Sequence, residues 1–167
     1  KEKGIAEFIQ ASNLIPNKYK NKVNFSIIGK SYENNNFNSI FFSMLKNSNI
    51  KYHGFKENIN SFIINSSCIV LPSYREGLSK FLLEGLSYGK PLITTNVPGC
   101  KELVKNNYNG FLVNVKDVDS LVKAFINFIE LSDKEKNKFS LNSYNMSKSY
   151  SYVFINNLYL KFNNNLK

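Results

Sequence analysis

Short apolar runs alternate with stretches of helical spacing along most of this 167-residue sequence. By their apolar, β-branched and aromatic content, strands are predicted at 23–28, 50–55, 68–71, 91–95 and 111–115. Helices are predicted at 4–14, 37–46, 59–65 and 79–88, with two or three more from Asp117 to Asn163. Strands that alternate with helices form βαβ units. The pattern therefore predicts one α/β domain: a doubly wound parallel sheet with helices on both faces and further C-terminal helices.

Length and composition narrow the class of protein. The chain is 43% hydrophobic, which is enough for one core, and its apolar runs are much shorter than the ~20 residues that span a bilayer. It opens at Lys1 rather than Met, so we expect a fragment of a longer protein. Cys68 and Cys100 do not make a disulfide framework, which favours a reducing, cytoplasmic location.

The formal charge of +10 invites a nucleic-acid or membrane interpretation. However, Arg75 is the single arginine among 22 basic residues, and the sequence has 27 Asn. Such a bias towards AT-rich codons explains much of the lysine excess. Proteins that read nucleic acids usually use arginine for bidentate contacts. We therefore expect no nucleic-acid partner.

Ligands of doubly wound sheets bind outside the carboxyl ends of the strands. Three strand ends lead into candidate loops, at 29–31, 54–56 and 72–77. The glycine of the first loop, Gly29, is a weak signal and is explained by a turn. The third loop is stronger because Ser79 is a good N-cap for the helix that follows. Free N–H groups and the helix dipole favour a phosphate there.

Two carboxylates flank this helix start. Glu76 precedes the helix, and Glu84, eight positions later, is expected to point away from Leu82 and Leu86, which would face the sheet. Carboxylates accept hydrogen bonds from hydroxyls, so a nucleotide sugar could lie across the helix tip with its sugar towards Glu76 and its ribose towards Glu84. Two unrelated surface glutamates remain the alternative on spacing alone.

The residues around these carboxylates carry a family resemblance. The stretch 71–102 resembles the C-terminal half of family 4 glycosyltransferases, which are retaining, two-domain enzymes of the GT-B fold. Glu76 and Glu84 match their E-x7-E pattern. Further matches are Pro72-Ser73 at the strand end, the segment 107–113, and Lys3-Gly4 at the first helix.

The resemblance implies roles for individual residues. Glu76 would hold the hydroxyls of the donor sugar and Lys3 the diphosphate, which makes them the expected catalytic pair. The expected donor-binding residues form three groups. Gly77, Leu78 and Ser79 would offer backbone N–H groups to the sugar or phosphate, and Glu84 would bind the ribose. Gly29, Phe55 and Lys56 complete the set, with the last two near the base. Such enzymes stabilise the departing nucleoside diphosphate with cations and helix-end donors, so no metal or other cofactor is expected.

The same resemblance implies partners and limits. The segment 97–100 is similar to members that build bacterial polysaccharides and lipid-linked glycans, often from UDP-activated sugars, so a glycan or lipid-linked acceptor and peripheral contact with the inner face of the cell membrane are expected. Residues 1–167 would form the nucleotide-sugar-binding domain. The family's N-terminal acceptor domain, the first strand of this half and an arginine that would precede Lys1 are missing. Leu78 replaces a frequent Phe.

Other signals have simpler explanations. Asp117-Val118-Asp119 has the D-x-D form of a metal site, but helix capping explains it. His53 is expected to be an ordinary strand residue. The apolar residues between Ile155 and Phe162 are expected to form a packing face.

Two other classes of function remain as alternatives. A non-catalytic docking or regulatory module with the same sheet is the first, although it would not need Glu76 and Glu84. The second is a basic surface that associates with nucleic acid or an acidic membrane.

Overall fold

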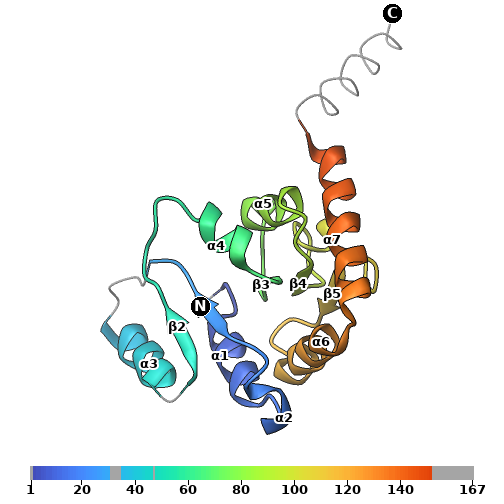
Figure 1. Cartoon of the computed structure of the whole chain (residues 1–167). Helices are drawn as coiled ribbons and strands as arrows, with labels where there is room; N and C mark the ends of the chain where they lie inside the picture. Colours follow the sequence, from blue (N-terminus) through green and yellow to red (C-terminus); the bar gives the residue numbers. More distant parts are fainter. Residues whose placement is uncertain (1, 31–34, 47, 152–167) are drawn as a thin grey trace, which may run out of the picture.

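The computed structural model describes residues 2–30, 35–46 and 48–151 (Figure 1). Its strands are β1 (Phe25–Ile27), β2 (Ile50–Tyr52), β3 (Ile69–Leu71), β4 (Leu92–Thr95) and β5 (Gly110–Val113). Its α-helices are α1 (Ile5–Asn13), α2 (Asn17–Lys20), α3 (Asn35–Lys46), α4 (Asn60–Asn65), α5 (Lys80–Ser87), α6 (Val118–Glu130) and α7 (Asp133–Ser147), and its 3-10 helices are η1 (Lys101–Leu103) and η2 (Lys148–Tyr150). None of these helices is long and apolar enough to cross a membrane.

The strands of the described residues form two parallel sheets. β1 pairs with β2, and β3, β4 and β5 pair in that order. In the doubly wound strand order 3-2-1-4-5-6, these sheets take the places 3-2 and 4-5-6. The place of the central strand, between β1 and β3, is therefore filled by no strand of the described residues.

Helices cover both faces of the larger sheet. In Figure 1, α4 and α5 lie on one side of β3, β4 and β5, and α1 and α6 lie on the other. Successive residues of a strand point to opposite faces. Leu92 of β4 accordingly joins a cluster with Leu82 and Leu86 of α5, whereas Ile93 joins a second cluster with Phe125 of α6.

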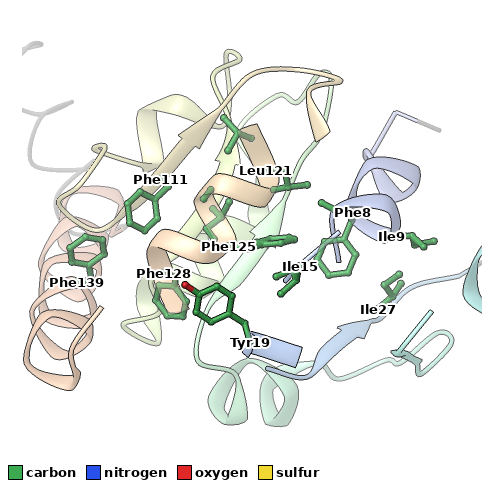
Figure 2. Packing of buried hydrophobic residues seen from close by; sticks show 14 of the residues in the cluster. Phe8, Ile9, Ile15, Tyr19, Ile27, Phe111, Leu121, Phe125, Phe128 and Phe139 are labelled. Atoms are coloured by element: carbon green, nitrogen blue, oxygen red, sulfur yellow. The ribbon is translucent and has the colours of Figure 1, made fainter. Parts of the chain in front are cut away.

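An aromatic contact joins the smaller sheet to the core cluster, of which Figure 2 shows Phe8 and Phe125. The Phe8 ring of α1 stands edge-on to Phe25 of β1 and to Phe125 of α6, with centroid distances of 5.6 and 5.8 Å. All three rings belong to one core cluster or pack directly against it. Helix α1 therefore holds β1 and β2 against α6.

The predicted α/β class, with parallel strands and helices on both faces, is confirmed. The helix predicted at 37–46 begins two residues earlier, at Asn35, so the Asn-rich residues that were expected to form a loop before it belong in part to α3. The short helices α2 and η1 were not predicted. The packing face proposed between Ile155 and Phe162 lies outside the described residues.

Candidate functional site

Helix α5 begins and packs as its sequence predicts. The Ser79 hydroxyl accepts a hydrogen bond from the Leu82 N–H at 3.4 Å and so caps the helix. Leu82 and Leu86 are fully buried against the sheet. Glu84 occupies another side of the helix and is half-buried. In the described part of the chain, its carboxylate has no hydrogen-bond or ion-pair partner.

The loop after β3 brings Glu76 together with Lys3. Lys3 Nζ lies 2.6 Å from Glu76 Oε1, and the Ser73 hydroxyl donates to the same oxygen at 2.7 Å. Ser73 is fully buried, the Glu76 side chain is 12% exposed, and the Lys3 side chain is 57% exposed. The sequence resemblance named Lys3 and Glu76 as site residues, and the structure places them in one ion pair.

Gly4 allows the start of α1 to touch this loop. Its φ of 66° lies in the left-handed region, and a Cβ there would overlap the Pro72 carbonyl oxygen. A glycine is required for so close an approach. The Tyr74 N–H also donates to the Glu2 carbonyl at 2.8 Å. Residues on both sides of Lys3 therefore contact the loop that carries Glu76.

A second loop, which follows β4 and was not assigned to the site from the sequence, contacts Gly77 and Ser79. The Ser79 N–H donates to the Gly99 carbonyl at 3.1 Å, and a Cβ on Gly99 would overlap the Gly77 carbonyl oxygen. The N–H of Ser79 is therefore already used, whereas those of Gly77 and Leu78 donate no hydrogen bond within the described residues. In the sequence, the Pro98-Gly99 pair is typical of a tight turn and could have drawn attention to this loop.

Polar residues at the end of β4 complete this support. The Thr95 hydroxyl donates to the Ser73 carbonyl, and the Thr94 hydroxyl donates to the Leu71 carbonyl at 2.7 Å. Cys100 is fully buried beside them, and this burial raises the pKa of its thiol. The backbone around Glu76 is thus bonded to β4 on one side and to the α1 start on the other.

The remaining predicted residues lie at the carboxyl ends of β1 and β2. The Gly29 N–H donates to the Gly54 carbonyl at 2.9 Å, and the Tyr52 hydroxyl donates to the Gly29 carbonyl at 2.9 Å. Phe55 is 64% exposed, and Lys56 is exposed as well. No hydrogen bond or ion pair among the described residues joins this group to the Lys3–Glu76 pair, so the candidate site consists of two separate groups of residues at the carboxyl ends of the strands.

The D-x-D segment at 117–119 and His53 have the structural roles that the sequence predicts for them. Asp117 caps α6 by accepting from the Ser120 N–H at 2.9 Å, and this bond together with one from Asn114 lowers the pKa of the Asp117 carboxyl. His53 continues β2 and lies against the Phe62 ring, with centroids 4.8 Å apart. The described residues hold no group of three or more His, Cys, Asp or Glu that could hold a metal ion.

The fold and the site define a Rossmann-like domain whose polar groups gather at the carboxyl ends of its strands. Residues 1–146 match the sequence model of the family described as "Glycosyl transferases group 1". The chain belongs to this family, and it has the fold of the C-terminal domain of these GT-B enzymes.

Two relatives are bacterial sugar transferases. An N,N'-diacetylbacillosaminyl-diphospho-undecaprenol alpha-1,3-N-acetylgalactosaminyltransferase of Campylobacter jejuni is 28% identical over 159 residues, which are 95% of this chain and 40% of the relative. A UDP-Gal:alpha-D-GlcNAc-diphosphoundecaprenol alpha-1,3-galactosyltransferase of Escherichia coli is 32% identical over 144 residues, 84% of this chain and 35% of the relative. The chain thus spans about two fifths of these relatives.

Solved structures show the same fold at low sequence identity. Anabaena HepE, in complex with UDP and glucose, matches 98% of this chain and 45% of its own with a TM-score of 0.84 and 19% identity. The C-terminal domain of a Francisella tularensis group 1 glycosyl transferase matches 89% of this chain and 79% of its own, with a TM-score of 0.78 and 23% identity.

Proposed function

We propose that this chain is the donor-binding half of a retaining glycosyltransferase that needs no metal and moves a sugar from a UDP-sugar to a glycan or a lipid-linked acceptor. The observation that carries the proposal is the Lys3–Glu76 ion pair at the carboxyl end of β3, beside the first turn of α5. The relatives support the choice of donor and acceptor, since one is named for UDP-Gal and both for diphospho-undecaprenol substrates.

The charges of the pair suit the two ends of such a donor. A nucleoside diphosphate that leaves the sugar carries negative charge, which a cation and the positive end of a helix stabilise. Lys3 supplies the cation, and the N–H groups of Gly77 and Leu78 lie just before α5. Glu76 accepts hydrogen bonds from the sugar hydroxyls. Lys3 and Glu76 therefore lie side by side, where the diphosphate and the sugar of one donor would meet.

The ribose and the base of the donor would contact a separate group of residues. Glu84, half-buried and without a partner in the described structure, accepts from the ribose hydroxyls. The exposed Phe55 ring and Lys56 lie near the base, next to the turn at Gly29. Ser79 acts as the helix cap rather than as a free N–H donor.

The complete protein supplies what this chain does not carry. We propose that an N-terminal domain binds the acceptor and that a strand preceding α1 fills the central place between β1 and β3. We also propose a cytoplasmic location with peripheral contact to the inner face of the membrane, where lipid-linked acceptors are found.

Titration of the chain with UDP by calorimetry tests the donor site. We expect UDP to bind and Glu84→Gln to weaken binding about tenfold or more, since hydrogen bonds to a charged group contribute about 1.5–3 kcal/mol. Glu130→Gln, at the end of α6, is the matched control and should bind as the unaltered chain does. Equal binding by the Glu84 and Glu130 variants would contradict the ribose contact, and a folded chain indifferent to UDP would favour a non-catalytic docking module.

A further inference from the structure

Tyr74, in the loop between β3 and α5, contacts two other segments of the chain. Its N–H donates to the Glu2 carbonyl at 2.8 Å, and its hydroxyl donates to Glu7 Oε1 on α1. The ammonium of Lys116, from the loop between β5 and α6, lies 5.1 Å from the centroid of its ring. One side chain and its backbone thus join three segments that are far apart in sequence.

The two hydrogen bonds lie on either side of Lys3. Glu2 directly precedes Lys3, and Glu7 follows it on the first turn of α1. Tyr74 itself is two residues from Glu76. Both members of the Lys3–Glu76 pair are therefore attached to backbone that Tyr74 holds. A lysine loses much side-chain entropy when it is fixed, so its ion pair depends on how well the two backbones are placed.

The carboxylate of Glu7 depends on the Tyr74 hydroxyl for a hydrogen bond. The second carboxylate oxygen of Glu7, Oε2, is buried and has no hydrogen-bond partner within the described residues. The Tyr74 hydroxyl is the hydrogen bond that this carboxylate accepts. Burial, and then the bond and charge of Glu7, raise the pKa of Tyr74 to about 12, so the hydroxyl keeps its proton at any physiological pH.

We propose that Tyr74 is a positioning residue: it ties the loop of Glu76 to the start of α1 and thereby sets the Lys3 ammonium against the Glu76 carboxylate, in the geometry that the donor's diphosphate and sugar need. The role of this geometry in donor binding rests on the proposed function. The placement of the pair itself does not, and the two are tested separately.

The first measurement uses the nucleotide-free chain. NMR follows the exchange with water of the Lys3 ammonium hydrogens, assigned with Lys3→Ala, and of the backbone N–H of residue 74. We expect Tyr74→Phe to speed both exchanges at least about fivefold, because the loop loses a hydrogen bond to a charged group. Tyr19→Phe is the matched control, since the Tyr19 hydroxyl also donates to a glutamate, Glu130, at the α2–α6 contact.

The second measurement is a double-mutant cycle on UDP affinity. If Tyr74 acts through Lys3, Tyr74→Phe should weaken binding about fivefold in the unaltered chain and less than about twofold in the Lys3→Ala chain. A merely structural role would weaken both equally. Glu7→Gln keeps an acceptor oxygen for the hydroxyl and should retain affinity within about twofold, whereas Glu7→Ala should behave like Tyr74→Phe.

Unchanged exchange in Tyr74→Phe, or an equal loss of affinity in both backgrounds, would overturn the proposal. Faster exchange in a chain that binds no UDP would instead overturn the donor site while Tyr74 keeps its role in placing the pair. Should Tyr74→Phe fail to fold, Glu7→Ala removes the same hydrogen bond, and its exchange rates decide the question.

Discussion

At the scale of single residues, two positions without side chains set how closely the segments of the site approach. Gly4 lies against the Pro72 carbonyl, and Gly99 lies against the Gly77 carbonyl. Both have φ values in the left-handed region, at 66° and 83°. On two sides of the loop that carries Glu76, backbone atoms thus contact backbone atoms directly. These two contacts involve no side chain that would lose conformational entropy.

Gly99→Ala is expected to destabilise the fold and to displace the Gly77 segment. Its Cβ would overlap a carbonyl oxygen, and the left-handed conformation adds about 1 kcal/mol for a residue with a Cβ. Gly54→Ala is the control, because Gly54 also has a φ of 66° but nothing within 4 Å of the added Cβ. Urea unfolding should show a clearly larger loss of stability for Gly99→Ala, and equal losses would contradict the close contact.

Spacing along the chain predicts local features of the site but not its contacts. The Ser79 cap and the side of α5 that carries Glu84 follow from residues a few positions apart, and both are found. The ion pair joins residues 73 positions apart, so no local pattern shows it. Glu76 was expected from its position before α5 and Lys3 from the sequence resemblance, whereas the support from Tyr74 depends on tertiary contacts alone.

At the scale of elements, apolar periodicity predicts the helices well and their limits less well. Helix α6 buries Leu121 and Phe125 as its spacing indicates, and Asp117 begins it as predicted. The four-residue helix α2 is too short to show a period. The strands are only three or four residues long and most are shorter than predicted, because hydrogen bonding to the neighbouring strand ends before the apolar run does.

The cap of α6 should make stability depend on acid pH. Hydrogen bonds to the ionised Asp117 lower its pKa in the folded chain below the ordinary 3.8, so the unfolded chain binds more protons in that window. The stability that this carboxylate contributes is present above 3.8 and is lost as the pH falls through the lowered pKa. The difference in Tm between the unaltered chain and Asp117→Asn, followed by circular dichroism, should therefore be largest near pH 7 and shrink below pH 3.8.

Asp119→Asn is the control for this pH dependence. Asp119 lies in the first turn of the same helix but accepts no hydrogen bond in the described structure. Its difference in Tm from the unaltered chain should change less with pH. A difference for Asp117→Asn that is constant from pH 7 to pH 2 would contradict the role of the charged cap.

At the scale of the whole molecule, the parts of the fold differ in how many partners they have. Strand β4 is paired on both sides, and all four of its residues are buried. Strands β1 and β2 pair only with each other among the described strands and keep exposed residues. Alternation in the sequence predicted parallel strands, but pairing between distant segments decides that they form two sheets.

Hydrogen exchange should reveal this difference in the native chain. We expect backbone N–H groups of β4 to exchange at least about tenfold more slowly than those bonded between β1 and β2, because the smaller sheet can open while the larger one stays intact. NMR or mass spectrometry measures both sets in one sample. Equal protection would mean that α1 and its Phe8 contacts make the two sheets a single cooperative unit.

The sequence separation of the Lys3–Glu76 pair has a consequence for folding. A contact that closes a loop of more than seventy residues forms only after much of the chain has lost its freedom, so it belongs to the late events of folding. The ammonium and the carboxylate are therefore expected to meet only once α1 and the β3–α5 loop have packed together. A signal that depends on their meeting should report mainly the molecules in which these two segments are assembled.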